Sequence, residues 1–446
     1  MGIFFFPSPA QFCGNKRTTM KQVKKHLVAA GFIISLFAIA CNKSNRREAI
    51  PDNVSNAVIL QWNEVTFNAL GGSANEHVLL GSRVYALVHA AMHDAVNATQ
   101  PKYERYAFEG IDPLANPEVA AASSAHHVLK TLVPEKASFL DSIFNKYLSS
   151  LQDDDSKAKG IILGVDAANA ALTLGHNSNG AKNPIGQPAP PVKPGDYKIV
   201  PPFNFIFAPF WEDSKLFSLS RKDQFRPVPP PALNSDNYAA AFNEVKEVGF
   251  VDSKTRTADQ TFFGKYWYET SETGWNRIAR VIAEDRKTPL FTTARLFALL
   301  NFAIADSYTA GWDAKLHYNF WRPFTAIHEA STDGNNETAE DGKWFPSEPT
   351  PPIQDYPSTH SALGNAAASV LIYFFGDKTA FSMKSPSAVP AGASRSFSSL
   401  TQAANENATS RVMAGIHFRF SCDAGQELGN RIGKWTVENH LKPIGE

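Results

Sequence analysis

The chain of 446 residues is long enough for one large domain, or two medium ones, with a sizeable apolar core. Its 43 lysines and arginines balance 43 acidic residues, which excludes a strong net field directed at nucleic acid or at an anionic membrane. The 32 phenylalanines, 8 tryptophans and 29 prolines favour a well-packed protein with long proline-rich connections.

The start of the chain has the pattern of an export signal. A basic stretch from Met20 to Lys25 precedes an apolar run from Leu27 to Ala40, which is short for a membrane span. Small residues lead directly into Cys41, so the segment resembles a bacterial lipoprotein signal in which Cys41 becomes lipidated. Ordinary secretion with cleavage nearby is the alternative. The expected parts are a leader at 1–41, of which 1–19 is a mis-called start, and a polar tether at 42–56.

The signal also sets the expected compartment and limits the cysteine chemistry. We expect an exported protein, anchored by lipid to the membrane and lying in the bacterial periplasm, at the outer membrane or at the cell surface. If Cys13 is removed and Cys41 is lipidated, only Cys422 of the three cysteines is left. We therefore expect neither a disulfide framework nor a thiolate metal site, and we interpret Cys422 as a packed thiol.

Beyond the tether, apolar residues recur at spacings of three and four, which predicts helices and no convincing strand. The expected fold class is all-α: two related four-helix bundles with a long, ordered, proline-rich insertion. The parts of this domain, 57–446, are a degenerate N-terminal bundle at about 57–175, the proline-rich wrap at about 176–236 and an active C-terminal bundle at about 237–446. The aromatic residues of the wrap argue against disorder, and we expect it to line the approach to a site.

An internal repeat supports the two-bundle interpretation. The stretch from Arg83 to Ala98 aligns without a gap with the stretch from Arg295 to Ala310, and Arg, Ala, Leu, Ala, Asp and Ala coincide. His89 and His93 lie one helical turn apart in the first copy, which is a spacing that metal ligands use. The residue aligned with His89 in the second copy is Asn301, and no third ligand completes a known metal-binding pattern. We therefore interpret the two histidines as structural.

Three polar clusters stand out in the second half. Lys315 is followed seven residues later by Arg322-Pro323, the segment from Tyr356 to His360 reads Tyr-Pro-Ser-Thr-His, and Ser410-Arg411 precedes His417. Three cations, two imidazoles and the free amides of a helix start suit a tetrahedral oxyanion, because guanidinium forks and backbone N–H groups match its oxygens.

In this order the clusters resemble the superfamily of vanadium-dependent haloperoxidases and type-2 phosphatidic acid phosphatases. The pattern of that family is K-x6-R-P, then P-S-G-H, then S-R-x5-H-x3-D. This chain departs from it at two positions: Thr359 replaces the glycine, and Ser421 stands where the family has the aspartate. The nearest acid is Asp423, so either a carbonyl or Asp423 is expected to orient His417.

The resemblance implies a role for each matching residue. His417 is the catalytic residue that touches the central atom, either as the vanadium ligand or as the nucleophile on phosphorus. His360 is the second catalytic residue, a general acid–base. The implied oxyanion-binding residues are Lys315, Arg322, Ser358, Thr359 and Arg411.

Two enzymatic activities share these residues. The first is a vanadium-dependent haloperoxidase that carries vanadate as cofactor and oxidises halide with hydrogen peroxide. The alternative is a vanadate-free phosphatase that cleaves a phosphoester through phosphohistidine, and a non-enzymatic oxyanion-binding lipoprotein is third. The length of the chain and the duplicated pattern favour the haloperoxidase. So does the sequence after the leader, in which we find no stretch that we interpret as membrane-spanning. Small-molecule substrates and no nucleic acid are expected as partners.

Overall fold

A computed structural model describes residues 50–445, apart from 52, 76, 177 and 181. The expected leader, the lipidation site at Cys41 and the tether as far as residue 49 lie outside the described residues. The fold is mostly helical, which confirms the expected all-α class.

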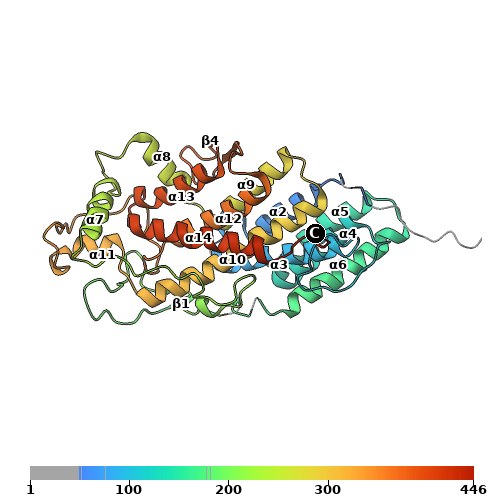
Figure 1. The fold of residues 1–446 in the computed structure, drawn as a ribbon, viewed down its shortest axis with the longest axis horizontal. Helices are drawn as coiled ribbons and strands as arrows, with labels where there is room; N and C mark the ends of the chain where they lie inside the picture. The colour runs from blue at the N-terminus through green and yellow to red at the C-terminus, as the bar shows by residue number, and fades with distance from the viewer. Residues whose placement is uncertain (1–49, 52, 76, 177, 181, 446) are drawn as a thin grey trace, which may run out of the picture. The chain divides into compact units, whose positions relative to one another are not determined.

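The first group of helices follows the predicted order and comprises α2 (Ala57–Ala69), α3 (Val78–Asn97), α4 (Pro117–Leu132), α5 (Ala137–Ser149) and α6 (Asp155–Thr173). Helix α4 packs against both α3 and α6, which Figure 1 shows in cyan and green. Glycines bring α6 close to α4, because a Cβ at Gly164 would overlap the carbonyl oxygen of Ala120. Asn116 caps α4 by accepting from the amides of Glu118 and Val119.

The second group comprises α7 (Asp236–Val248), α8 (Ala258–Tyr266), α9 (Ser271–Asp285), α10 (Leu290–Tyr318), α11 (Pro323–His328), α12 (Thr359–Phe375), α13 (Leu400–Met413) and α14 (Arg419–Asn439). Helix α12 packs against α10 and α14, and α10 packs against α3 of the first group (Figure 1). A Cβ at Gly429 of α14 would overlap the carbonyl oxygen of Ala362 on α12, so glycine again permits a close helix pair.

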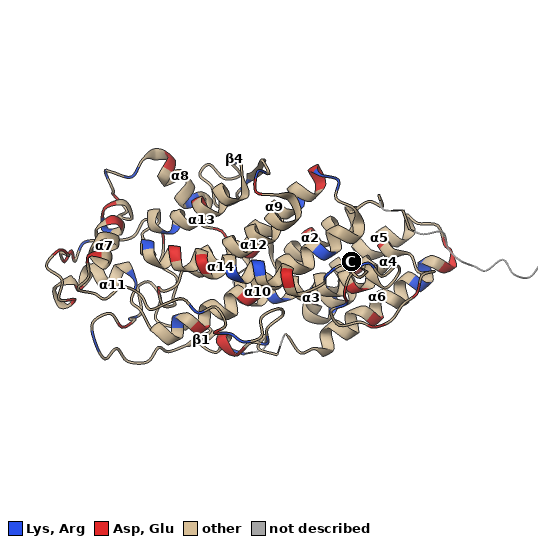
Figure 2. Ribbon diagram, viewed as in Figure 1, with Lys and Arg blue, Asp and Glu red and all other residues tan. Residues whose placement is uncertain are grey.

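Helix α10 corrects one interpretation made from the sequence. It is long and apolar enough, by length and composition, to cross a membrane, and it is the one helix of the described part of the chain for which this holds. Its apolar window is 94% buried against protein, which accounts for that composition by a position in the core. Figure 2 shows charged residues of both signs spread over the surrounding helices, in line with the balanced total.

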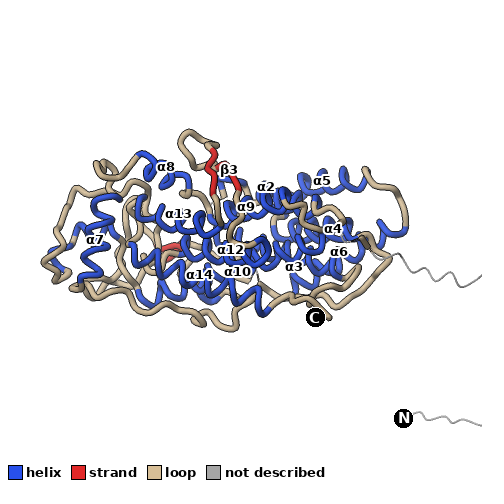
Figure 3. Tube along the Cα trace, turned by 45° about the horizontal axis from the view of Figure 1, so that its top comes forward, coloured by secondary structure: helices blue, strands red, loops and turns tan. Residues whose placement is uncertain are grey.

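Short strands and turns complete the fold, and the strands were not predicted. Two antiparallel pairs are present, β1 (Ile185–Gly186) with β2 (Ile206–Phe207) and β3 (Phe381–Lys384) with β4 (Ser394–Phe397) (Figure 3). The 3-10 turns are η1 (Gly72–Ala74), η2 (Pro134–Lys136), η3 (Trp211–Asp213) and η4 (Ala330–Thr332). The β3–β4 hairpin escaped prediction because strands of four residues are too short to show a clear alternation.

The proline-rich wrap is held to the helices by main-chain hydrogen bonds. The amide of Phe207 donates to Pro352 O at 2.8 Å, and the indole of Trp312 on α10 donates to Phe207 O at 3.2 Å. Further along, the Arg226 guanidinium makes two hydrogen bonds of 2.8 Å with the Asp313 carboxylate. These contacts fix the aromatic part of the wrap beside α10.

Candidate anion-binding active site

The three polar clusters come together where several helix ends meet. Lys315 lies in the last turn of α10, Arg322 is the N-cap of α11 and Ser358 is the N-cap of α12. Arg411 lies near the end of α13. Helix α13 ends at Met413, because Gly415 takes a φ of +78°.

His417 therefore lies in the tight turn between α13 and α14. The amide of Ile416 reaches back to Arg411 O at 3.1 Å, which links the backbone positions of the two site residues. The His417 side chain is buried, with 3% of its surface exposed. Burial first, and then the charges of Arg322 and Lys315, hold the pKa of His417 well below its usual range, so the ring is neutral near pH 7.

The neighbours of the ring define which nitrogen carries the proton. Nη1 of Arg322 lies 3.0 Å from Nε2 of His417, and a guanidinium has only donors. Nε2 therefore accepts from Arg322 and is the unprotonated nitrogen, and Nδ1 carries the hydrogen. Nδ1 lies 2.8 Å from Oδ1 of Asp355, although no donor is aligned on that oxygen as a hydrogen bond.

Asp355 is the acid beside His417, and the sequence analysis missed it. Both expected sources of orientation, a carbonyl or Asp423, were wrong, since the Asp423 side chain is exposed on α14. Ser421, the residue that stands in place of the family's aspartate, donates its hydroxyl to Oδ2 of Asp355. Burial raises the pKa of Asp355 to about 6, and the nearby cations Arg322 and Lys315 act in the opposite direction.

Two buried guanidinium groups supply positive charge. Arg322 is 1% exposed and donates to Ile353 O at 2.7 Å and to Ile416 O at 2.8 Å, with Asp355 at 3.8 Å. Arg411 is 5% exposed, and its Nε has no partner. Its Nη1 lies 3.5 Å from Trp267 O, and its guanidinium lies 5.1 Å from the centre of the Tyr268 ring. Burial lowers the pKa of Arg411 to about 10.

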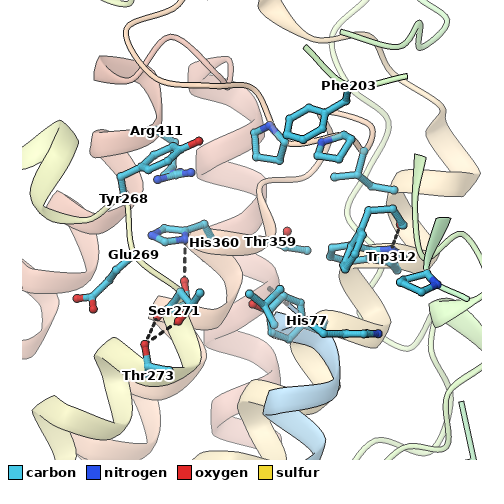
Figure 4. A pocket seen from close by; sticks show the side chains of 18 of the residues that line it. His77, Phe203, Tyr268, Glu269, Ser271, Thr273, Trp312, Thr359, His360 and Arg411 are labelled. Atoms are coloured by element: carbon cyan, nitrogen blue, oxygen red, sulfur yellow. Dashed lines mark hydrogen bonds between the residues drawn. The ribbon is translucent and has the colours of Figure 1, made fainter. Parts of the chain in front are cut away.

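A large cavity opens over these groups. Its volume is about 900 Å³, and the predicted site residues that line it are Arg322, Thr359, His360, Arg411 and His417. Figure 4 shows Arg411 and His360 on one side of the cavity, with Phe203 and Trp312 across from them. A set of cations and neutral imidazoles at one end of a cavity suits an anion.

Two predicted oxyanion residues do not line this cavity. The ammonium of Lys315 is fully buried and donates to Gln354 O at 2.6 Å and to Asp355 O at 2.8 Å. Ser358 is also fully buried, and its hydroxyl accepts from the amide and the hydroxyl of Ser361. Lys315 thus supports the loop that carries Asp355, and Ser358 caps α12.

Thr359, which replaces the family's glycine, is accommodated by a glycine elsewhere. It lies in the first turn of α12 and is not among the residues with positive φ. Its methyl group fills the space over Gly311 of α10, where a Cβ would overlap it. The larger side chain therefore fits without moving the start of α12.

His360 lies between the oxyanion end of the cavity and α9. Its Nδ1 is 2.8 Å from Oγ of Ser271, the contact drawn as a dashed line in Figure 4. Burial, and then the charge of Arg411, keep the pKa of His360 well below its usual range. Ser271 was not found in the sequence, because nothing local to the first turn of α9 marks it.

The residues interpreted as structural make structural contacts. Nε2 of His89 lies 2.8 Å from the Asn63 amide nitrogen, and Nε2 of His93 lies 3.0 Å from Glu104 O. Within the described residues, no group of three or more His, Cys, Asp or Glu side chains is arranged to hold a metal ion. Cys422 is fully buried, and burial raises the pKa of its thiol to about 12.

Comparison with known proteins agrees with the motifs. Residues 295–446 match the family described as VCPO second helical-bundle domain. The vanadium chloroperoxidase of Curvularia inaequalis is 22% identical over 500 aligned positions, which cover 85% of this chain and 81% of that protein.

Solved structures of bacterial enzymes have the same fold. A bacterial vanadium-dependent iodoperoxidase superposes with a TM-score of 0.74 at 24% identity, over 89% of this chain and 99% of the other. The holo form of a bacterial vanadium-dependent chloroperoxidase gives 0.67 at 17% identity, over 88% and 98%.

Together with the three motifs, these matches support the resemblance of the chain to the superfamily of vanadium haloperoxidases and type-2 phosphatidic acid phosphatases. Within it, all the relatives named above are vanadium haloperoxidases.

Proposed function

We propose that this protein is a vanadium-dependent haloperoxidase that uses hydrogen peroxide to oxidise a halide to a hypohalous species. The observation that carries the proposal is a pair of buried guanidinium groups, Arg322 and Arg411, beside a neutral histidine whose Nε2 accepts from Arg322. The names of the relatives support this activity over the phosphatase alternative, which uses the same residues.

The residues present fit vanadate. Arg411 is buried without a carboxylate hydrogen-bonded to it, and its unpartnered Nε is a donor that an oxyanion would satisfy. Arg322 and the amides at the start of α12 would hold further oxygens, and Nε2 of His417 is the donor atom for the metal. When bound, vanadate would supply the Lewis acidity that makes peroxide able to oxidise halide.

The protein's own contribution is to hold charge and protons in place. The Asp355 carboxylate lies 2.8 Å from Nδ1 of His417, and its charge favours the proton on that nitrogen rather than on Nε2. Ser421 and the carbonyl contacts of Lys315 fix the Asp355 segment. His360, neutral and positioned by Ser271, is placed to take or give a proton at an oxygen of the bound anion.

A paired assay tests this function. One portion of the purified protein is loaded with orthovanadate and given peroxide, bromide or iodide, and a phenolic halogen acceptor. A second, vanadate-free portion receives 4-nitrophenyl phosphate. We expect vanadate-dependent halogenation that is lost in His417→Ala and retained in His317→Ala, an exposed histidine outside the cavity.

The other outcomes are informative. Phosphate release without halogenation would make the protein a phosphatase acting through His417. Silence in both assays, with vanadate still bound, would reduce it to an oxyanion-binding protein.

We also propose that the protein is exported and anchored through lipidated Cys41, which the signal-like sequence before it supports. Mass spectrometry of the mature N-terminus, compared with Cys41→Ala, tests this. An unmodified N-terminus at another residue would contradict the lipid anchor.

A further inference from the structure

The cavity is far larger than a halide ion or hydrogen peroxide requires. A volume of about 900 Å³ is in the range of pockets that enclose a drug-sized organic molecule. The anion-binding groups occupy only one end of it. The rest of the cavity therefore has room for a second ligand.

That remaining space is lined by aromatic side chains from two distant segments. Phe203, Phe205 and Phe207 come from the proline-rich wrap, and Tyr308 and Trp312 come from α10. The three phenylalanines are only partly buried, so the apolar surface they present is incompletely covered by protein. Aromatic faces arranged around an open space favour a flat, π-rich ligand.

The aromatic residues of the wrap that line the cavity are held in place by hydrogen bonds and ring packing. Phe207 is held through its amide to Pro352 and through its carbonyl to the Trp312 indole. The β1–β2 pair ties the same segment to Ile185, which also lines the cavity. Phe203 and Phe205 pack edge to face with ring centres 5.5 Å apart. Preorganised aromatic groups lose little entropy when a ligand binds.

We infer that this aromatic part of the cavity binds a planar aromatic compound of the phenol class and presents it to the oxidant formed at the oxyanion end. The inference rests on the proposed function and specifies its organic substrate. Figure 4 shows the relation between the two parts, with Phe203 and Trp312 facing the side that carries His360 and Arg411.

The reaction balances with what the proposed function supplies. Peroxide, halide and a proton give hypohalous acid and water. The aromatic ring then attacks the halogen, a carbon–halogen bond forms, and the oxygen–halogen bond breaks. The ring carbon loses its proton to the released hydroxide, so the products are the aryl halide and a second water.

Binding is tested first, apart from any turnover. Isothermal titration of the vanadate-free protein with 2-naphthol should give a dissociation constant below about 1 mM, and Phe203→Ala and Phe205→Ala should each weaken it about tenfold or more. Phe345→Ala is the matched control, because Phe345 is 53% exposed and lies outside the cavity. No binding by the wild type, or equal binding by all variants, overturns the inference whatever the protein halogenates.

Turnover then distinguishes the inference from the proposed function. The ratio of brominated 2-naphthol isomers made by the vanadate-loaded protein should differ from that made by free hypobromite, and Phe203→Ala should move it toward the free ratio. An identical ratio in all samples overturns halogenation inside the cavity. Binding without any halogenation would refute both the proposed function and the acceptor role, while the aromatic site itself would stand.

Discussion

The two groups of helices share a frame, and among the described residues the candidate anion site lies in the second group. In the first half, Gly160 and Gly164 let α6 approach the main chain of α4; in the second, Gly425 and Gly429 let α14 approach α12. In both, the first glycine meets the carbonyl of the helix N-cap, Asn116 or Ser358. This shared contact aligns the two helix pairs.

The central helices repeat a second device. Asp94 on α3 accepts from the amides of residues 106–108 at 2.7–2.9 Å, and Asp306 on α10 accepts from those of residues 217–219 at 2.7–2.8 Å. Arg83 and Arg295 each donate Nε to a carbonyl just beyond the last helix of their half, at His176 and Leu441. Scaffold residues thus repeat, and the chemistry is added at the loops.

The difference lies beside the capped helix start. Asn116 and Ser358 both use their side chains on amides of their own helices, but the start of α12 also lies at the cavity lined by Arg322, Arg411 and His417. In the second half the same kind of helix start faces buried cations. A duplicated fold therefore contains equivalent helix starts, and the residues in the loops between helices determine which of these starts can form a site.

The largest expected contrast is between two buried histidines. His417→Ala should lower kcat by at least about 10³-fold because it removes the atom that would hold the central atom of the anion. His89→Ala, in the first half, should leave kcat within about twofold and lower the free energy of unfolding by about 2–4 kcal/mol, since His89 is fully buried beside Phe297. Steady-state kinetics and urea denaturation measure both. Loss of activity with metal dependence at His89 would contradict its structural role.

The next largest effect on activity is expected at Asp355, which lies outside the repeated stretches. Asp355→Asn should reduce activity or vanadate affinity about 10–100-fold, because Nδ1 of His417 loses its charged partner. Above a pH of about 6, the pKa of Asp355, its carboxylate is ionised, so the wild-type rate should rise as the pH increases through that region. The variant should not show this rise in rate.

A relocated carboxylate is the control for Asp355. The double variant Asp355→Ser with Ser421→Asp places the acid at the family's usual position and should recover part of the activity, whereas Asp423→Asn should change nothing. A double variant no better than Asp355→Ser would mean that the side chain at 355 is needed for the shape of the loop alone.

The sequence allowed much of the fold and the site to be predicted. Helices were found because apolar periodicity is local. Arg322, His360, Arg411 and His417 were predicted together because each sits in a compact motif, and all four line one cavity. Asp355 was missed because its contact with His417 joins segments distant in the chain. Lys315 was expected at the anion because it begins the K-x6-R-P motif, and in the structure its ammonium donates to two nearby carbonyls.

A stability comparison tests whether the repeated aspartates have the same role. Asp94→Asn and Asp306→Asn should each lower the free energy of unfolding by about 3 kcal/mol, because each leaves three backbone amides with a weaker acceptor. Thermal and urea unfolding of both variants measure this. Equal losses support a shared frame, and a loss in only one half would show that the repeat is limited to sequence.

The smallest expected effects are at the two close helix pairs. Gly164→Ala and Gly429→Ala should each lower the free energy of unfolding by about 1–3 kcal/mol, since the added methyl group would overlap a main-chain carbonyl of the facing helix. Their effects on activity should differ. Moving α14 away from α12 also moves Ser421 and the turn that carries His417, so Gly429→Ala should slow turnover, while Gly164→Ala should leave it unchanged. If Gly164→Ala slowed turnover as much at equal stability, the first half would take part in shaping the site, and the division between a scaffold half and an active half would fail.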